Sequence, residues 1–533
     1  MQSLPAWLSP LPDAPTMRAI DRWAIEEHGV PSLDLMERAG AGVARAVERL
    51  VPDGPAAVVC GKGNNGGDGL VVARLLRDAG REATVVLTAA PHELAGDARV
   101  NLERLPGAPP VPLSGASEAL VASSVLVDAL LGTGFQGEAR GVVAEAIAQV
   151  NRAGGPVVSV DVPSGVDAST GVVCGDAVCA TVTVTFQAAK PGLWIRPGKA
   201  HAGEVQVIDI GIPRGAPSRG AIGLIEPSVL ARLPRRVPGS TKFSSGHVLI
   251  VGGSRGLTGA PRMTARASMR AGAGYVTALV PASQQAVIAT GELPELMTRG
   301  LPDDGEGMTA DGVEPVLRAA ERGGTVALGP GLGRREAAVS FARALARATP
   351  LPIVLDADGL NAHAGCLADL AARPAPTVLT PHAGELGRLL ELDSAEIERE
   401  RLRHVRAAAE RARAVVVLKG DDTLIADGDG RVAISPGGSP ALATAGTGDV
   451  LTGVIATLLA QQLDAFTAAA AGVWLHAAAG REAAIRLGTA EAVIASDVIA
   501  ALPAARAAAQ QDEGGAAAER RARATHAGGG RDG

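Results

Sequence analysis

Aromatic residues are scarce in this chain and make up only 2% of its 533 residues. Few stacking platforms for bases or sugars can therefore exist. The formal net charge of −6 also lacks the basic excess that marks proteins which bind nucleic acid. The composition therefore argues against a nucleic-acid partner.

Long apolar runs and paired cysteines are missing as well. Residues 1–12 place no basic segment before their apolar residues, so they do not form a secretory signal. The longest apolar stretch begins at Val450 and is interrupted at 461, 462 and 464, well short of a membrane span. No two cysteines form a C-x-x-C pair or a metal-ligand spacing, so we expect reduced thiols in a cytoplasmic protein. The cysteines are Cys60, Cys174, Cys179 and Cys366.

Lysine is the third rarity, because only five of the 50 basic residues are lysines. A lysine at a motif position is therefore informative. What the chain has in abundance is length and apolar content, with 47% hydrophobic residues. A chain of this size exceeds the growth limit of a single core, so we expect two domains.

Residues 445–453 form the most informative stretch, in which small residues and glycines precede Asp449 and a long apolar run, 450–460. The apolar run predicts a buried helix. The glycines then lie at its N-terminus, where free N–H groups favour an anion and Asp449 can act as a base. On this stretch alone, ordinary turn and cap residues are an equally good interpretation.

The first half contains a strand, a glycine-rich loop and a helix in succession, predicted at 56–60, 61–69 and 70–78. This arrangement places a phosphate group at a helix N-terminus. The loop matches neither the G-x-G-x-x-G fingerprint nor a Walker loop. Its asparagines, glycines and acid offer side-chain amides and close backbone approach, which favours a functional loop over a plain turn.

Two further strands, predicted at 125–131 and 156–160, also end in polar residues. In parallel sheets, ligands bind beyond the carboxyl ends of the strands. Side-chain oxygens gathered there suit a hard cation, and Asp161 could also transfer protons. With the strand at 56–60, three successive strands thus supply Asn65, Asp128, Asp161 and Ser164.

These motifs resemble the NAD(P)H-hydrate epimerase family over residues 15–213, through 64–68, 132–138 and 161–164. The resemblance implies a Rossmann-like domain that holds a hydrated nicotinamide nucleotide, with Asp161 in contact with the substrate. We expect Asp161 to be the general acid/base. The implied substrate-binding loop residues are Asn64, Asn65, Gly66, Gly67, Asp68, Gly132, Thr133, Gly134, Phe135, Gln136, Gly137 and Glu138. The implied potassium ligands are Asn65, Asp128 and Ser164.

A Pro/Gly-rich segment at 211–220 separates this half from a second series of strands with polar ends. Several of those ends have ordinary alternatives. His382 could be a surface turn residue, and Asp356 with Asp358 could cap a helix. Lys419 follows an apolar strand and is either a solvated edge residue or a phosphate contact, of which its rarity favours the contact.

The second half resembles the nucleotide-dependent NAD(P)H-hydrate dehydratases, whose fold is similar to ribokinase, over residues 234–502. The shared motifs lie at 252–254, 329–333, 356–361, 380–385, 419–420 and 446–449. The residues implied to bind the adenine nucleotide are Lys419, Gly420, Asp421, Asp422, Thr423 and Gly448. Those implied to contact the S-hydrate are Ala260, Gly331, His382 and Asp449. One departure is Ser439 before Pro440, where the family pattern would have asparagine, and it affects only a detail of the nucleotide loop.

We therefore expect two doubly wound α/β domains: a Rossmann-like epimerase domain at 1–216 and a ribokinase-like dehydratase domain at 217–505, followed by a disordered tail at 506–533. The expected cofactors are K⁺ in the first domain and Mg²⁺ with ADP as co-substrate in the second. Asp449 would deprotonate the hydroxyl of the S-hydrate while the amides at 446–448 stabilise the transferred phosphoryl group. We expect a homo-oligomer.

Two alternatives stay open on the sequence. The second half could be a small-molecule kinase of the ribokinase type, because the residues at 446–449 would serve either reaction. The first half could be a regulatory nucleotide-binding or scaffold module, because fold alone does not establish activity.

Overall fold

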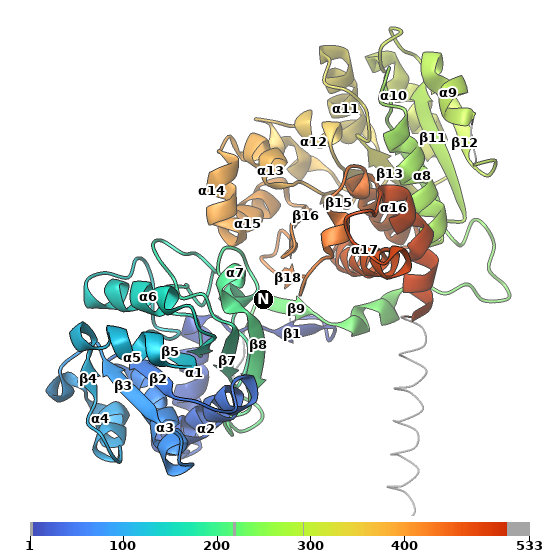
Figure 1. Ribbon diagram of the computed structural model, residues 1–533. Helices are drawn as coiled ribbons and strands as arrows, with labels where there is room; N and C mark the ends of the chain where they lie inside the picture. The colour runs from blue at the N-terminus through green and yellow to red at the C-terminus, as the bar shows by residue number, and fades with distance from the viewer. Residues whose placement is uncertain (1–3, 217–219, 291–292, 509–533) are drawn as a thin grey trace, which may run out of the picture.

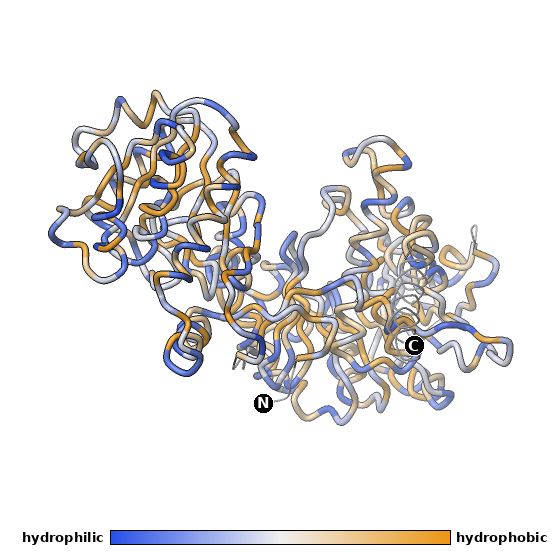
Figure 2. Tube along the Cα trace, turned by 90° about the horizontal axis from the view of Figure 1, so that it is seen from below, coloured by the Kyte–Doolittle hydropathy of each residue, from blue (hydrophilic) through white to orange (hydrophobic). Residues whose placement is uncertain are grey.

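The computed structural model describes residues 4–216, 220–290 and 293–508. Two β-sheets, each covered by helices, lie side by side in Figure 1, the first half in blue to green and the second in green to red. Figure 2 shows the same two halves from below, with hydrophobic stretches running through both. The described helices include none that is long and apolar enough to cross a membrane.

The smaller sheet has seven described strands, all parallel, in the order β4-β3-β2-β5-β6-β7-β8. Its strands are β2 (Ala56–Cys60), β3 (Ala83–Leu87), β4 (Val111–Pro112), β5 (Val125–Ala129), β6 (Val157–Val160), β7 (Val182–Phe186) and β8 (Glu204–Ile208). The helices of this half are α1 (Ala14–Arg22), α2 (Ser32–Leu50), α3 (Asn64–Asp78), α4 (Gly96–Glu103), α5 (Ser117–Ala122), α6 (Val142–Ala153) and α7 (Lys199–Ala202).

The larger sheet has eleven described strands, in the order β1-β9-β18-β17-β16-β15-β14-β13-β10-β11-β12. They are β1 (Leu8–Pro10), β9 (Ile222–Ile225), β10 (His247–Val251), β11 (Tyr275–Pro281), β12 (Met297–Leu301), β13 (Thr325–Leu328), β14 (Ile353–Leu355), β15 (Thr377–Leu379), β16 (Val415–Leu418), β17 (Leu424–Ala426) and β18 (Val432–Ile434). The strands from β12 to β16 pair in parallel, whereas β17 is antiparallel to both of its neighbours, β16 and β18. The helices are α8 (Gly259–Ala271), α9 (Gln285–Ala289), α10 (Val313–Ala320), α11 (Glu336–Ala348), α12 (Asp358–Asn361), α13 (Ala383–Leu390), α14 (Ser394–Arg399), α15 (Arg401–Ala412), α16 (Thr447–Ala460) and α17 (Ala465–Leu487).

The central strands of both sheets are buried on both faces. In β10, Val248 and Ile250 face the core under α8, α16 and α17, whereas Leu249 and Val251 face the core under α10, α11, α13 and α15. In β2, Ala57 and Val59 face away from the core that contains their neighbours in the strand. Because side chains alternate along a strand, a continuous apolar run supplies both cores. The predicted fold class, two doubly wound α/β domains, is confirmed.

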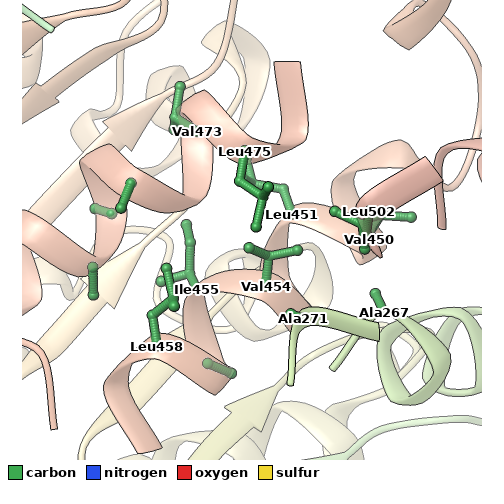
Figure 3. Close-up of a cluster of buried hydrophobic side chains, with 14 of the residues drawn as sticks. Ala267, Ala271, Val450, Leu451, Val454, Ile455, Leu458, Val473, Leu475 and Leu502 are labelled. Carbon is green, nitrogen blue, oxygen red and sulfur yellow. The ribbon is translucent and has the colours of Figure 1, made fainter. Parts of the chain in front are cut away.

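Helix α16 is the buried helix predicted from the apolar run. Figure 3 shows Val450, Val454 and Leu458 of α16 packed between Ala267 and Ala271 of α8 and the side chains of α17. All five residues belong to one core. Close contact of α8 and α16 requires small residues, and a Cβ at Gly453 would clash with α8 backbone. The core thus fixes the N-terminus of α16 in space.

Two segments that lie within residues 1–216 join the larger sheet or its core. Strand β1 lies within 1–216 but pairs antiparallel with β9 of the larger sheet, Leu8 opposite Ile225. Ile195, also from the first half by sequence, is buried in the core of the second. The physical reason is that β1 covers the edge of β9, which would otherwise expose unpaired backbone groups. The boundary at 217–219 itself lies outside the described residues, as does 509–533 of the expected tail, whereas 506–508 are helical.

Helix α3 begins earlier than the sequence predicts, at Asn64 instead of Leu70. Glycines are poor helix formers, so the sequence favours a loop through residue 69. In the structure the absence of side chains lets the first turn of α3 approach its strands. A Cβ at Gly66 would clash with the Gly61 carbonyl oxygen, and one at Gly69 would lie 2.5 Å from the Ala129 methyl. Close packing therefore outweighs helix propensity here.

Two candidate active sites

The strand ends of the smaller sheet bring Asp128 and Ser164 together, as the sequence predicts. Asp128 is in β5, is completely buried and accepts hydrogen bonds from the Ser159 hydroxyl (2.8 Å), the Ser164 hydroxyl (2.5 Å) and the Ser164 N–H (2.9 Å). Burial raises the pKa of Asp128 and these hydrogen bonds oppose the rise. No cationic side chain in the described part of the chain forms an ion pair with it.

Asn65 joins this group through the backbone of Leu131. Its side-chain amide donates to the Leu131 carbonyl oxygen (3.0 Å), and the Ser164 hydroxyl oxygen lies 3.4 Å from the same atom. The Ser164 hydroxyl also accepts the Leu131 N–H (2.9 Å). The site is therefore rich in oxygen atoms around a buried carboxylate without a counter-ion, a donor set that suits a hard cation.

Asp161 lies beyond the end of β6, beside that oxygen cluster, in a left-handed backbone conformation with φ of +66°. Such a conformation is unusual for a residue other than glycine and concentrates at functional sites. The Asp161 carboxylate accepts hydrogen bonds from the Lys190 ammonium (2.6 Å) and the Thr185 hydroxyl (3.1 Å), and the Thr133 N–H points to its second oxygen (3.4 Å). The strained backbone thus fixes a carboxylate between two loops.

Sequence reasoning missed Lys190, whose side chain is only 1% exposed. Its ammonium also donates to the Thr185 hydroxyl (2.8 Å) and the Phe186 carbonyl oxygen (3.0 Å). A buried lysine that pairs with a carboxylate in a site is a candidate functional residue. Two features of the sequence could have indicated it, because Lys190 is one of only five lysines and follows another parallel strand, β7.

Two further acids surround this pair. Burial and the Asp161 charge, opposed by Lys190, raise the pKa of Asp21 to about 6. Burial and the charges of Asp161, Asp21 and Asp97, again opposed by Lys190, raise the pKa of Asp68 well above its usual value. Asp68 is a predicted site residue, but Asp21 is an ordinary helix residue by sequence, and only the packing of α1 places it here.

The two predicted substrate loops differ in exposure. Asn65, Gly66, Gly67 and Asp68 are buried in the first turn of α3, whereas Asn64 is exposed. In the second loop Gly132, Thr133 and Phe135 are partly buried. Its remaining members are exposed: Gly134, Gln136, Gly137 and Glu138. The first loop is therefore a buried wall, and the second forms an open side of the site.

The second site is built around Asp356, at the end of β14 and 3% exposed. One of its oxygens accepts hydrogen bonds from Lys419 (3.0 Å) and the Thr380 hydroxyl (2.8 Å), and the other from the Thr452 hydroxyl (2.8 Å). Burial alone would raise the pKa of Asp356, but Lys419 and the hydroxyls hold it below its usual value. The alternative that Asp356 merely caps a helix is therefore wrong.

Lys419, at the end of β16, has a second acidic neighbour in Glu385 (3.5 Å). Burial would lower the pKa of Lys419, but the two carboxylates raise it. Lys419 is thus a fixed positive charge and not a solvated edge residue. The Cβ position of Gly448, in the first turn of α16, lies 3.6 Å from its ammonium nitrogen.

Asp449 lies in that same first turn of α16, one turn before Thr452. Burial and the Asp356 charge, opposed by Lys419, raise its pKa to about 7. A carboxylate with this pKa can exchange a proton near neutral pH. The free N–H groups of the helix start lie beside it, so a base and an anion site share one helix terminus.

His382 serves as the N-cap of α13. Its Nδ1 accepts hydrogen bonds from the N–H groups of Gly384 (3.0 Å) and Glu385 (3.3 Å), while its side chain is 55% exposed. Burial and the Lys419 charge lower its pKa, with Glu385 opposing. Nδ1 therefore acts as an acceptor, while Nε2 lies 3.6 Å from the Glu385 carboxylate on the exposed side of the ring. A structural role of His382 at the helix start is therefore compatible with a contact to the substrate.

A cavity of about 560 Å³, a size usual for ligand sites, extends from this cluster toward the first half. Of the predicted nucleotide-binding residues, Lys419, Gly420, Asp421, Thr423 and Gly448 line it. Asp422 does not, because it is fully buried and bonded to Arg401 (3.0 Å) and to the N–H of Arg196 (2.8 Å). Ser439, which stands where the family pattern has asparagine, lines the cavity and caps the short helix that follows. His476 of α17, also in the lining, was not found by sequence reasoning.

The remaining predicted residues, Ala260 and Gly331, lie next to each other. Gly331 has φ of +64°, and a Cβ there would lie 3.3 Å from the Ala260 methyl. Met263, one turn further along α8, contacts Gly446 at the start of α16. The two residues therefore form a wall that leads to the helix terminus carrying Asp449.

Fold and sites together define a two-domain α/β protein with a Rossmann-like half and a ribokinase-like half, each with a charged site at its strand ends. Residues 32–192 match the family model described as YjeF-related protein N-terminus, and 248–504 the model described as NAD(P)H-hydrate dehydratase. A protein of Moorella thermoacetica named bifunctional NAD(P)H-hydrate repair enzyme is 43% identical, and the match covers 92% of this chain and 95% of that protein. A protein of Salinibacter ruber with the same name is 41% identical, and the match covers 93% of this chain and 95% of that protein. The chain belongs to the family of bifunctional NAD(P)H-hydrate repair enzymes.

Among solved structures, the ADP/ATP-dependent NAD(P)H-hydrate dehydratase of Bacillus subtilis, co-crystallised with ATP and Mg²⁺, is 30% identical. The match covers 53% of this chain and 96% of that one, with a TM-score of 0.45. The two family models and the bifunctional relatives confirm both resemblances that the motifs indicated.

Proposed function

We propose that this protein repairs hydrated NADH and NADPH. Its first half interconverts the R and S hydrates, and its second half dehydrates the S form at the expense of ADP, giving AMP and phosphate. The observation that carries the proposal is Asp449, a carboxylate with a pKa near 7 at a helix N-terminus, beside Lys419 and a cavity of nucleotide size. The names of the relatives support it.

In the first half, Asp161 is the proposed general acid/base. Proton transfer to the C6 oxygen of the hydrate lets water leave, because the lone pair of the ring nitrogen stabilises the cation that remains. Water then returns to either face, and its proton is taken up, which interconverts R and S. Lys190 holds the Asp161 carboxylate in place (2.6 Å) and supplies a nearby positive charge.

The donor set at Asn65, Asp128 and Ser164 fits the proposed potassium ion. Its oxygens surround a buried carboxylate with a raised pKa, and the charge that would compensate this burial is a cation. Bound there, K⁺ would supply positive charge at the strand ends. Asn65, Asp128 and Ser164 themselves tie the ends of β5 and β6 to the start of α3.

In the second half, Asp449 is proposed to take the proton of the C6 hydroxyl, whose oxygen then forms a bond to the β-phosphorus of ADP as AMP leaves. Lys419 and the N–H groups at the start of α16 stabilise the charge on the transferred group. The C6–O bond then breaks, phosphate departs, and loss of the C5 proton restores the dihydronicotinamide ring. Mg²⁺ bound with ADP would neutralise phosphate charge, and the nearby carboxylates are Asp356, Glu385 and Asp449.

The test is recovery of absorbance at the reduced-nicotinamide band from mixed R and S hydrates, with ADP or with ATP. We expect full recovery with ADP for the unmodified protein. Asp161→Asn should recover only the S fraction, beyond spontaneous epimerisation, and Asp449→Asn should recover almost none. A stable phosphorylated product without inorganic phosphate would instead make the second half a kinase. Unchanged R-hydrate turnover in Asp161→Asn would reduce the first half to a binding module.

Two further proposals concern the setting of the enzyme. We propose that it acts in the cytoplasm, which fits its four unpaired cysteines, two of them exposed. We also propose a homo-oligomer, which sedimentation of the purified chain would test.

A further inference from the structure

We propose that Lys199, which belongs to the first half by sequence, is a nucleotide-binding residue of the second site. The inference rests on the proposed nucleotide-dependent activity and extends it, because it makes the co-substrate pocket a joint product of both halves. Lys199 begins α7, which in Figure 1 lies on the side of the first half that faces β18.

Lys199 lines the same cavity as Lys419 and Gly448. Its ammonium donates to the Asp421 carbonyl oxygen (2.9 Å) and lies 3.4 Å from the Asp421 carboxylate. The Cβ position of Gly437, which also lines the cavity, is 3.6 Å away. The ammonium therefore lies against the two segments of the second half that carry Asp421 and Gly437.

The cavity lining is mixed in character. It includes the apolar side chains of Leu442, Ala443 and Leu451, which suit a base, and the two lysines, Lys199 and Lys419. These two are the only lysine or arginine side chains in the lining that the described residues form. A nucleoside diphosphate carries about three negative charges at neutral pH, so its ribose–phosphate part is favoured beside the ammonium groups.

The charge of Lys419 is already compensated, by Asp356 at 3.0 Å and Glu385 at 3.5 Å. Among the described residues Lys199 pairs with one acid, Asp421, and shares it with the Arg196 guanidinium (3.3 Å). Arg196 can thus retain the Asp421 carboxylate while the Lys199 ammonium turns to a ligand. The Lys199 ammonium can therefore turn to a nucleotide phosphate without leaving the Asp421 carboxylate unpaired.

The position of Lys199 is fixed by buried contacts before any ligand arrives. The Arg196 N–H donates to Asp422 (2.8 Å), which is fully buried and also paired with Arg401. Ile195 is buried in a core of the second half. A ligand therefore gains the Lys199 contact without ordering a mobile segment, which keeps the cost of binding small.

The experiment compares Lys199→Met, Lys199→Arg and the matched control Arg196→Met in the full chain. Arg196→Met removes the other cation on Asp421, but its side chain does not line the cavity. We measure ADP and adenosine binding by calorimetry, and KM for ADP and kcat with the S-hydrate. A charged hydrogen bond to phosphate predicts that Lys199→Met raises Kd and KM for ADP about tenfold, with kcat and adenosine binding changed less than about twofold. Lys199→Arg should restore most of the affinity, and Arg196→Met should stay within about twofold of the unmodified protein.

Three results would overturn the inference. Unchanged ADP affinity in Lys199→Met would show that the ammonium does not reach the nucleotide. Equal weakening by Lys199→Met and Arg196→Met would show that both residues only hold the halves together. Equal loss of ADP and adenosine binding would exclude a contact with the phosphates. If the unmodified protein itself bound no ADP, the proposed function would fail first, which is a distinguishable outcome.

Discussion

Replacing Asp449 with asparagine should stabilise the protein above neutral pH while it removes dehydration. The pKa of Asp449 is raised from 3.8 to about 7 by burial and by Asp356. At 1.36 kcal/mol per pH unit, ionising this carboxyl in the folded state costs about 4 kcal/mol relative to the unfolded chain. The side chain is not fully enclosed, so screening reduces the expected gain in Asp449→Asn to about 2 kcal/mol. The lost attraction to the α16 N-terminus, about 0.5 kcal/mol, opposes this gain without reversing it.

The pH dependence has a definite sign. Since the folded-state pKa lies above the unfolded one, the folded state binds the extra proton between about pH 4 and pH 7. The unmodified protein therefore loses the contribution of Asp449 as pH rises through that window. At pH 4 the carboxyl is protonated in the folded state, and the two proteins should be nearly equal in the free energy of unfolding.

The assay is urea unfolding of both proteins at pH 4.5, 6 and 8, followed by circular dichroism, with hydrate turnover measured in parallel. We expect the stability difference to grow with pH and kcat of the variant to fall by about 10²- to 10⁴-fold. The kcat/KM of the unmodified protein should rise with pH through an apparent pKa near 7. A variant that is less stable at pH 8, or a difference independent of pH, would refute the reasoning from burial.

Two predictions concern the first half. Lys190→Met leaves the Asp161 carboxylate without its ammonium partner (2.6 Å), so we expect the free energy of unfolding to fall by about 3 kcal/mol. We also expect the variant to lose R-hydrate turnover and to keep S-hydrate turnover. Undiminished epimerisation in that variant would contradict the assigned role of the pair. Gly66→Ala places a methyl group against the Gly61 carbonyl oxygen, whereas the matched control Gly63→Ala meets no atom within 4 Å. Thermal unfolding should show a loss of about 2 kcal/mol for Gly66→Ala only, and equal effects would exclude the steric explanation.

Strand ends and helix starts could be predicted from the sequence because their signals are local. The apolar runs of β5, β14 and β16 and the change to polar residues at their ends follow from the composition of a few neighbouring residues. Asp128 and Lys419 were predicted in this way, whereas the central position of Asp356 was not. Parallel strands then bring such ends to one edge of a sheet, so the existence of both sites followed without coordinates.

Contacts between segments far apart in the sequence were decided only by the tertiary structure. Lys190 lies 29 residues from Asp161, and Asp21 reaches the same site on α1. Asp422 belongs to a motif that resembles a nucleotide site, yet its side chain is buried against Arg401. Nothing in the local pattern reveals which face of a loop meets another element.

The clearest such long-range contacts are those that segments of the first half make within the second half. Residues 8–10 carry no strand pattern of their own and pair with β9 because that edge is open. Lys199 is an unremarkable lysine by sequence, and it enters the second site only because Ile195 and Arg196 are anchored in the other half. The sequence by itself determined the two folds, the strand-end residues and the chemistry they offer, since these depend on short-range pattern. Which residues of one half complete the site of the other depends on packing over long sequence separations, and only the tertiary structure decided it.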